Sequence, residues 1–278
     1  MRKANHGIRL ALFMALLASC ASEQTAQGPL AQAEPAPTRP NPVPFHIAVP
    51  GTTVKLEFVP IPRDERTPGA REYYLAATET TWDMYDAFVF AMDRAEGQVD
   101  PPDAWARPSK PYILMDRGFG HAGYPAISVS YKGASEFCKW LAHKTGKRLR
   151  LPSEAEWEHA CRAGTSAITN LNDIAWFKEN SAVDMRETTH PIATKSPDAL
   201  GLYDMLGNAA EWTTSAAGTG VARGGSFKEP ADAVTAIARR PDDKSLNRTD
   251  PQIPRSVWWL ADGGFIGFRV LCEIEPDR

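Results

Sequence analysis

The feature that most constrains the fold of this 278-residue chain is the loss of regular hydrophobic periodicity near residue 165. Before that point, apolar residues recur at the spacing of helices or strands. After it, short apolar pieces alternate with Gly, Pro, Asn and Asp to the end of the sequence. Helices followed by a long, irregular and aromatic-rich half predict an α+β fold, with little regular secondary structure in the C-terminal half.

Strands and a first helix are expected near the start of the folded part. Residues 53–62 alternate apolar and polar side chains and end in proline, which is typical of a strand. Residues 73–94 begin in the same way and change to helical spacing at Thr80. The apolar face of this helix is predicted to hold Met84, Tyr85, Phe88 and Met92. Residues 266–274, "IGFRVLCEI", alternate again and predict a closing strand.

Two further helices have stronger signals. Residues 128–147 repeat apolar side chains at three- and four-residue spacing, and Gly146 stands where a helix C-terminus favours glycine. Residues 151–164 form the other helix, in which Ser153 and Glu156 have the spacing of a capping box. Its inner face is predicted to hold Trp157, Ala160 and Cys161, with Gly164 at its end.

The N-terminus predicts export. Residues 1–19 combine three basic residues, no acidic residue and a short apolar run, as in a signal peptide. The sequence "LASC" that ends at Cys20 resembles the lipobox of bacterial lipoproteins, so Cys20 is expected to carry lipid. The predicted location is the bacterial cell membrane or outer membrane, with the domain in the periplasm or outside the cell. An ordinary cleaved signal peptide is the alternative.

The mature chain is predicted to be a flexible linker followed by one domain. Residues 20–44 are rich in Ala, Pro, Gln and Glu and hold little that could be buried. Residues 45–278 are long enough for a single domain with long loops. Removal of residues 1–19 changes the formal net charge from −3 to −6, and no basic cluster is present. A nucleic-acid partner is therefore not expected.

Three cysteines remain after Cys20, namely Cys138, Cys161 and Cys272. No two of them have the Cys-x-x-Cys spacing of a zinc site or a redox pair. Cys138 and Cys161 lie on the predicted inner faces of helices, where a small, inert thiol is the usual role. The five histidines of the mature chain show no spacing typical of metal ligands.

Five segments in one order carry a family resemblance. They are "ATETTWDMYDAFV", the stretch from "YPAISVSY" to "EHACRAGT", "GLYDMLGNAAEWT", "VARGGSF" and "GFIGFRV". Together they resemble the formylglycine-generating enzyme, or sulfatase-modifying factor, superfamily, from about residue 50 to residue 274. The resemblance implies an irregular scaffold related to C-type lectin domains. It implies the fold more firmly than any reaction, because members differ in chemistry.

The resemblance also implies a structural calcium ion and a disulfide. Calcium would be held by the side chains of Asp204 and Glu211 and by the carbonyls of Met205, Gly207 and Ala209. The alternative is a polar turn whose acids cap the backbone. Family members with disulfides often join the cysteine matching Cys138 to one just after "GFR". Here that position is Val270, and Cys272 returns to the same strand face, so a Cys138–Cys272 bridge stays open.

Copper is not expected. In the oxidising members of the family, two cysteines after the Arg-Gly-Gly-Ser turn bind copper, for which thiolates are suitable ligands. Here the matching stretch is "FKEPADAV", without cysteine, and Ala210 replaces a family tryptophan. The resemblance therefore does not carry over copper-dependent oxidation of cysteine, and no catalytic residue is assigned.

A ligand groove is predicted around the retained turn, at Ser226, Phe227, Lys228, Arg239 and Arg240. Trp258 and Trp259 fit either a groove or the core. These features favour a binding or assembly module that recognises an exported protein, peptide or glycan. The alternative is an oxidative protein- or peptide-modifying enzyme of the same superfamily that acts on an exported substrate.

Overall fold

The computed structural model describes residues 42–101 and 103–274. The predicted signal peptide, Cys20 and most of the predicted linker lie outside the described residues. The described part has three α-helices, α1 (Trp82–Val89), α2 (Tyr131–Thr145) and α3 (Glu154–Thr165). It also has two short 3-10 helices, Leu171–Asp173 and Lys244–Asn247. None of the described helices is both long enough and apolar enough to cross a membrane.

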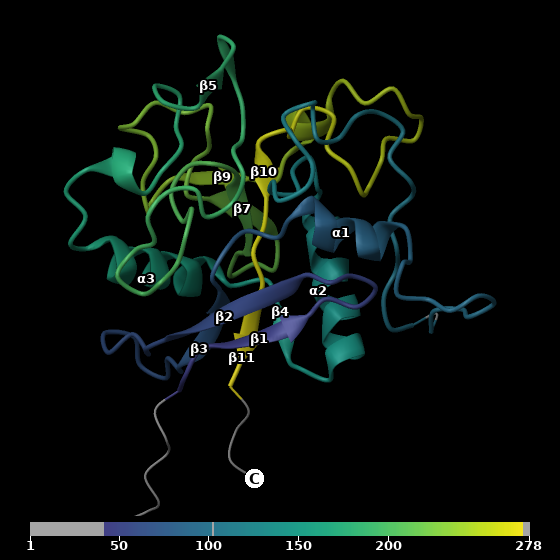
Figure 1. Ribbon diagram of the computed structural model, residues 1–278, viewed down its shortest axis with the longest axis horizontal. Coiled ribbons are helices and arrows are strands. Elements are labelled where there is room, and N and C mark those ends of the chain that lie inside the picture. Colours follow the sequence, from purple (N-terminus) through teal and green to yellow (C-terminus); the bar gives the residue numbers. More distant parts are fainter. Residues whose placement is uncertain (1–41, 102, 275–278) are drawn as a thin grey trace, which may run out of the picture. The chain divides into compact units, whose positions relative to one another are not determined.

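The first sheet joins the two ends of the domain. Its five strands follow the order β1-β2-β3-β11-β4, and all neighbours are antiparallel. Phe45 pairs with Phe58, and Cys272 pairs with both Tyr74 and Leu149. Figure 1 shows this sheet at the end of the domain where the described chain begins and finishes. The strand bounds are β1 (Phe45–Ala48), β2 (Lys55–Ile61), β3 (Tyr73–Ala76), β4 (Leu149–Arg150) and β11 (Leu271–Glu273).

The second sheet is built from the irregular half of the sequence. Its order is β10-β7-β8-β9, with β10 parallel to β7 and the other pairs antiparallel. A separate hairpin, β5–β6, extends at the opposite end of the view from β1 and β11 (Figure 1). The strand bounds are β5 (Ala182–Val183), β6 (Arg186–Glu187), β7 (Ala210–Thr214), β8 (Gly220–Arg223), β9 (Arg239–Pro241) and β10 (Ile266–Gly267).

The single strand predicted over residues 266–274 is wrong, because β10 and β11 belong to different sheets. Phe268, Arg269 and Val270 connect them, and all three are fully buried. A segment that crosses the interior between two sheets has buried side chains on both sides, so it does not keep the in–out alternation of one sheet. Arg269 is thereby carried into the centre of the domain.

The helix termini follow the capping signals of the sequence. The predicted capping box is present: Glu156 N donates to Ser153 Oγ at 3.3 Å, and Ser153 N donates to Glu156 Oε2 at 2.8 Å. Gly146 ends α2 in the left-handed region, with φ of 67°. α1 is shorter than predicted, because Ala91 adopts a φ of 54° just after Val89. Met92, predicted on its buried face, is 55% exposed.

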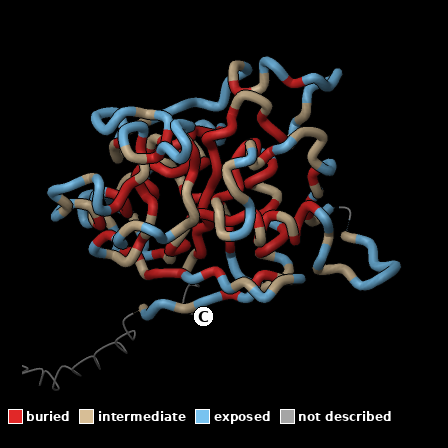
Figure 2. Tube along the Cα trace, turned by 45° about the horizontal axis from the view of Figure 1, so that its top comes forward, coloured by how far each residue is buried: buried red, intermediate tan, exposed pale blue. Residues whose placement is uncertain are grey.

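The core consists of two clusters of buried side chains. Figure 2 marks the buried residues in red along the Cα trace. The larger one packs α1 and α2 against the first sheet and contains Tyr85, Phe137 and Trp259. The smaller one lies against α3 and contains Trp157 and Cys161. Of the two alternatives predicted for Trp259, a groove residue or a core residue, the structure shows the core residue. Burial of each such aromatic side chain contributes about 1.5–3 kcal/mol to stability.

Candidate functional site

A buried ionic centre lies beneath the turn at residues 204–211. Arg269 donates to Glu211 through Nε at 2.7 Å and through Nη2 at 2.5 Å. Trp157 Nε1 donates to the same carboxylate at 2.6 Å. The remaining Arg269 donors reach the carbonyls of Ala76 at 3.0 Å and Tyr203 at 2.8 Å. Both oxygens of Glu211 are thus engaged by groups of the chain itself.

Two more acids complete this ionic centre. Glu79 accepts hydrogen bonds from Asn208 Nδ2 at 2.8 Å and from Ala209 N at 2.9 Å. Burial raises the pKa of Glu79, and the nearby Asp204 and Glu211 raise it further. Asp204 Oδ2 accepts from Ala193 N at 2.8 Å, whereas Asp204 Oδ1 has no partner among the described residues. Burial raises the pKa of Asp204 to about 6.

This geometry bears on the calcium ion that the family resemblance implies. Asp204 Oδ1 is buried and accepts no hydrogen bond among the described residues, so it could bind a cation. Glu211 does not fit that role, because its oxygens already bind a guanidinium that carries the compensating positive charge. Within the described ranges, no three His, Cys, Asp or Glu side chains are arranged to hold a metal ion. Calcium at Asp204, Met205, Gly207, Ala209 and Glu211 stays a prediction, and Glu211 is the doubtful ligand.

The predicted groove residues do not line one common groove, because their side chains face different parts of the domain. Ser226 is buried, and its N and Oγ both donate to Glu229 Oε2, at 2.8 and 2.5 Å. Arg239 forms a bidentate pair with Glu154 of α3, at 2.7 and 3.1 Å. Arg240, the next residue of β9, points to the other face of the strand, as pleating requires. Its guanidinium carbon lies 5.0 Å from the centre of the Phe265 ring.

A basic hollow forms where Lys228 meets loops from other parts of the chain. Its volume is about 300 Å³, and Arg240 flanks it across Phe265. Lys228 Nζ lies 5.1 Å from the centre of the same Phe265 ring. Arg186, from β6, lies 4.7 Å from the Phe119 ring centre. The residues that line the basic hollow are Arg117, Phe119, Arg186, Lys228, Ala261, Asp262 and Gly264.

Positive charge is poorly compensated in the basic hollow. Burial lowers the pKa of Lys228, and Arg117 and Arg240 lower it further, although Glu229 and Glu187 act against them. Asp262 also lines the hollow, and its two carboxylate oxygens accept from Thr249 N and Oγ1, each at 2.7 Å. Its negative charge offsets part of the positive charge of Arg117 without forming an ion pair. The described residues provide no ion pair for Lys228, Arg117, Arg186 or Arg240 within 4.0 Å. An anion that entered would meet several unpaired cations.

Of the predicted groove residues, only Lys228 lines the basic hollow. Arg240 flanks it across Phe265, and Phe227 is fully buried against Phe119. Sequence reasoning missed the rest of the lining. Arg117 lies in the long Pro- and Gly-rich loop, and Arg186 lies in a two-residue strand. Arg117 is fixed by hydrogen bonds to Ser128 Oγ at 3.1 Å and Leu260 O at 2.8 Å. Such long-range contacts leave no periodic signal in the sequence.

The thiols lie away from the basic hollow. Cys161, on the buried face of α3, belongs to the smaller core cluster, and burial raises its pKa to about 12. Cys138 is buried in the larger cluster, and burial raises its pKa strongly. Cys272 belongs to the same cluster as Cys138, and β4 packs between their elements. Cys138 is a free thiol in this structure, and the Cys138–Cys272 bridge stays a prediction.

The fold belongs to the α+β class, with few helices and a largely irregular second half. Similarity to known proteins gives its family. The family described as "Sulfatase-modifying factor enzyme 1-like domain" matches residues 31–273. This chain belongs to that family, and its formylglycine-generating-enzyme-like, C-type-lectin-like fold confirms the predicted one. Solved structures agree on the fold: Treponema denticola variable protein 1 aligns with a TM-score of 0.57 at 20% identity, over 84% of this chain and 100% of the other. PvdO from Pseudomonas aeruginosa aligns with a TM-score of 0.55 at 22% identity, over 83% and 98%.

Curated relatives have different names. The formylglycine-generating enzyme of Mycobacterium tuberculosis is 30% identical over 131 residues, 41% of this chain and 40% of the relative. The serine/threonine-protein kinase Pkn1 of Chlamydia trachomatis is 38% identical over 93 residues, 34% of this chain and 14% of the kinase. The inactive Cα-formylglycine-generating enzyme 2 of Mus musculus is 28% identical over 210 residues, 64% and 66%. The chain thus spans less than half of the first two relatives.

Proposed function

We propose that this protein is a ligand-binding module of the formylglycine-generating-enzyme-like superfamily, and that the basic hollow holds an anionic group of its ligand. The observation that carries this proposal is the convergence of Lys228, Arg117 and Arg186 around one cavity. The described residues provide no ion pair for these three cations within 4.0 Å. An acidic segment of an exported peptide or protein would supply the missing charge.

The cations around the basic hollow repel one another, which costs free energy in the folded protein. Like charges that approach each other at a partly buried site repel by an amount that falls with the local dielectric constant. Three cations but only one acid, Asp262, line the basic hollow, and perturbed charges cluster at functional sites. Phe119 adds an apolar wall to the basic hollow, so a ligand with an apolar part beside its acid fits best.

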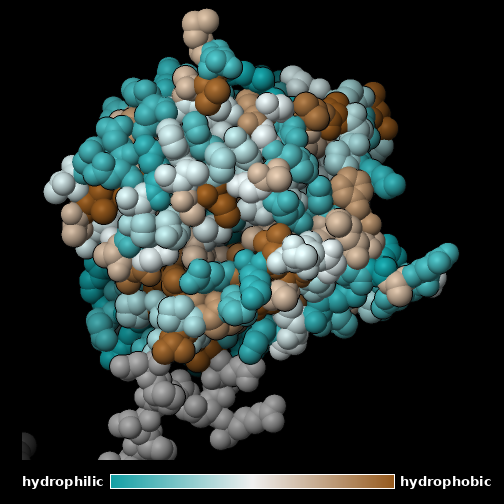
Figure 3. Space-filling view, viewed as in Figure 1, coloured by the Kyte–Doolittle hydropathy of each residue, from teal (hydrophilic) through white to brown (hydrophobic). Residues whose placement is uncertain are grey.

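The shape of the surface agrees with a local site. On the face seen in Figure 3, apolar residues form small separate groups among hydrophilic ones. A broad apolar patch of the kind that marks large protein interfaces is not seen on that face.

The alternative function is oxidation of an exported peptide or protein. Its support comes from relatives named formylglycine-generating enzyme. Against it stand the sequence after the Arg-Gly-Gly-Ser turn, which has no cysteine up to Pro241, and the burial of Cys138 and Cys161 in the core. A buried thiol with a raised pKa is a poor nucleophile and a poor metal ligand at neutral pH. We therefore favour binding over oxidation.

The cellular setting belongs to the same proposal. Lipid on Cys20 would tether the domain to a bacterial membrane, and residues 21–44 would act as its spacer. The domain would then meet exported ligands in the periplasm or outside the cell. Metabolic labelling with an alkynyl fatty acid tests the anchor, because Cys20→Ser should abolish the label if Cys20 carries the lipid.

Binding is tested with an acidic peptide of alternating Glu and Leu and a matched peptide of Gln and Leu. Fluorescence anisotropy with the purified mature chain should show binding of the acidic peptide only, and the binding should weaken as salt rises. Lys228→Gln should reduce affinity about tenfold, since a charge-assisted contact contributes roughly 1.5 kcal/mol. Lys55→Gln, the same change in the first sheet, should have no effect. Equal affinity of both peptides, or copper-dependent oxygen consumption with a cysteine peptide, would refute the proposal.

A further inference from the structure

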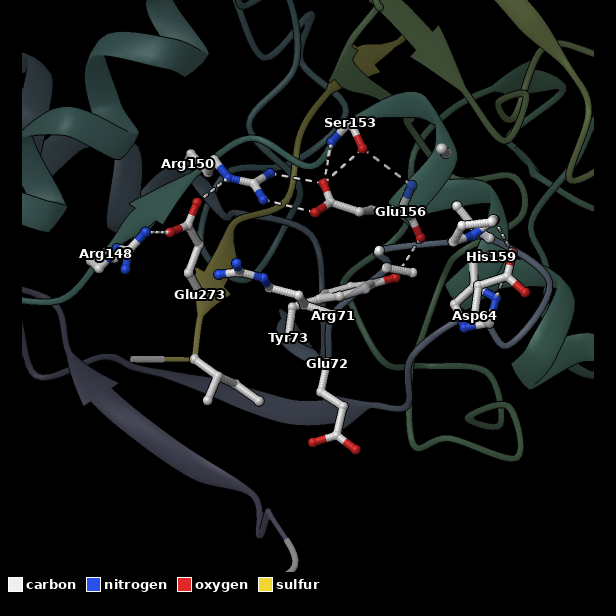
Figure 4. A pocket seen from close by; sticks show the side chains of 16 residues that line it. Asp64, Arg71, Glu72, Tyr73, Arg148, Arg150, Ser153, Glu156, His159 and Glu273 are labelled. Atoms are coloured by element: carbon white, nitrogen blue, oxygen red, sulfur yellow. Dashed lines mark hydrogen bonds and ion pairs between the residues drawn. The ribbon is translucent and has the colours of Figure 1, made fainter. Parts of the chain in front are cut away.

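A second cavity, which the sequence did not predict, lies beside α3 and is separate from the basic hollow. We name it the α3 pocket. Its volume is about 450 Å³, within the range of small-molecule sites. It is bounded by the β2–β3 connection at residues 62–72, the first turns of α3, β4 and the end of β11 (Figure 4). These elements belong to the first sheet and to α3, whereas the basic hollow is lined by loops and β6.

One wall of the α3 pocket is a closed network of ion pairs. Arg150 donates to both oxygens of Glu156, at 2.7 and 2.8 Å, and to Glu273 Oε1 at 2.8 Å. Arg148 pairs with Glu273 as well. Ser153 N and Oγ donate to Glu156 Oε2, at 2.8 and 2.7 Å. The two acids of this wall are therefore already satisfied, and the wall is held in one arrangement by the capping box of α3.

Arg71 lines the α3 pocket but takes no part in this network of ion pairs. Figure 4 shows its guanidinium reaching toward the Arg150–Glu273 pair, while the carboxylate of Glu72 extends away from it. Among the described residues, Arg71 has no ion pair within 4.0 Å, and its side chain is exposed. Because the acids of the neighbouring wall already pair with Arg148 and Arg150, the N–H donors of Arg71 are available to an incoming anion.

The floor of the α3 pocket is apolar. The Tyr73 ring is buried, and its hydroxyl donates to the carbonyl of Glu156 at 2.6 Å, which leaves the ring carbons to face the cavity (Figure 4). Burial raises the pKa of Tyr73 strongly, so this hydroxyl stays neutral. Pro68, Ala155 and Ile274 line the same space. The α3 pocket thus combines one free cation with an apolar surface.

We propose that the α3 pocket binds a small monocarboxylate, with its carboxylate paired to Arg71 and its apolar body against Tyr73 and Ile274. A cationic ligand is disfavoured because three of the four acids in the lining, Asp64, Glu156 and Glu273, already pair with arginines. The carboxylate of the fourth acid, Glu72, points away from the Arg150–Glu273 pair (Figure 4). The planar fork of one guanidinium, with two parallel donors, matches the two oxygens of a single carboxylate. This inference is independent of the function proposed for the basic hollow.

The test uses isothermal titration of the full mature chain with 4-phenylbutyrate and with 4-phenylbutanamide, which differ only in charge at the head group. The carboxylate should bind, and the amide should bind at least about tenfold more weakly, the factor expected for loss of a charge-assisted pair. Arg71→Gln should weaken binding of the carboxylate by about the same factor. Arg255→Gln, the same change at an exposed residue outside the α3 pocket, should leave it unchanged.

Two further variants locate the ligand within the cavity. Tyr73→Phe keeps the ring and should retain binding, whereas Ile274→Asp places an acid on the apolar floor and should abolish it. Lys228→Gln should leave the part of the binding that Arg71→Gln removes unchanged, which separates this site from the basic hollow. Equal binding of the acid and the amide, or equal binding by the native chain and Arg71→Gln, would overturn the proposal. Circular dichroism of each variant confirms that a loss of binding is not a loss of fold.

Discussion

The ionic centre around Arg269 and the basic hollow around Lys228 use the same residue types in opposite ways. In the ionic centre, one fully buried guanidinium is surrounded by the acids Glu211, Glu79 and Asp204 and by backbone carbonyls. In the basic hollow, Lys228 and its neighbouring arginines stand partly exposed and without paired acids. The difference indicates that burial with compensation serves the fold, whereas accessible charge without compensation is available to a ligand.

Removal of the central guanidinium should have the largest effect. Arg269→Met leaves Glu211 buried with only Trp157 as a donor, and also strips the carbonyls of Ala76 and Tyr203 of their partner. Loss of one partner of a buried pair costs about 3–5 kcal/mol. Urea unfolding followed by tryptophan fluorescence measures the change. Arg240→Met, the matched change at the basic hollow, should stay within about 0.5 kcal/mol of the native chain, as exposed substitutions do. Similar losses in both variants would remove the distinction between the two regions.

The acids of the ionic centre should make stability depend on pH. Because burial raises the pKa of Asp204 to about 6, its contribution is present below pH 4 and is lost as pH rises through 6. In metal-free buffer the native chain should lose roughly 2–3 kcal/mol more than Asp204→Asn between pH 4 and 7.5. The Asn variant keeps an acceptor for Ala193 N and tolerates the left-handed φ of 54°. Parallel pH profiles would show that Asp204 titrates normally.

Added calcium tests whether Asp204 in the ionic centre binds a metal ion. If Asp204 is a ligand, millimolar calcium should raise the melting temperature of the native chain at pH 7.5, where an ionised Asp204 would bind it. The effect should vanish in Asp204→Asn. If Glu211 takes no part, as its pairing with Arg269 indicates, calcium should bind weakly. A large calcium shift that survives in Asp204→Asn would place the ion elsewhere.

Sequence reasoning succeeded where the determinants are local. The capping box at Ser153 and Glu156, the glycine at the end of α2 and the buried face of α3 all depend on residues a few positions apart. It failed where a residue's role depends on distant partners. The family resemblance assigned Glu211 to a calcium site, which stays a prediction, but no local signal pointed to its pairing with Arg269, 58 positions away. Five matched motifs gave the fold, since their order reflects the whole scaffold.

A smaller effect is expected at His121, which fixes the loop that carries Arg117 and Phe119. Its ring nitrogens each lie 2.9 Å from a carboxylate, of Asp86 and of Asp116. Burial lowers the pKa of His121, but these two acids outweigh burial and the net pKa is raised. Its stabilising contribution is therefore full below about pH 6.5 and is lost as pH rises through the raised value. His121→Gln should reduce stability at pH 5.5 more than at pH 9, and equal losses at both would exclude a charged histidine. Peptide binding by the native chain should weaken over the same pH range.

The smallest effect on stability, and the most diagnostic in sign, is expected at Lys228. Its ammonium faces other cations at the basic hollow, and burial and these cations together lower its pKa. Lys228→Gln removes that repulsion, so unfolding in low salt should show the variant as stable as the native chain or more stable by a few tenths of a kcal/mol. Lys55→Gln should show no such gain. Added salt screens the repulsion and should bring Lys228→Gln and the native chain together. A clear loss of stability in Lys228→Gln would mean that this lysine supports the fold, and the basic hollow would then lose its functional interpretation.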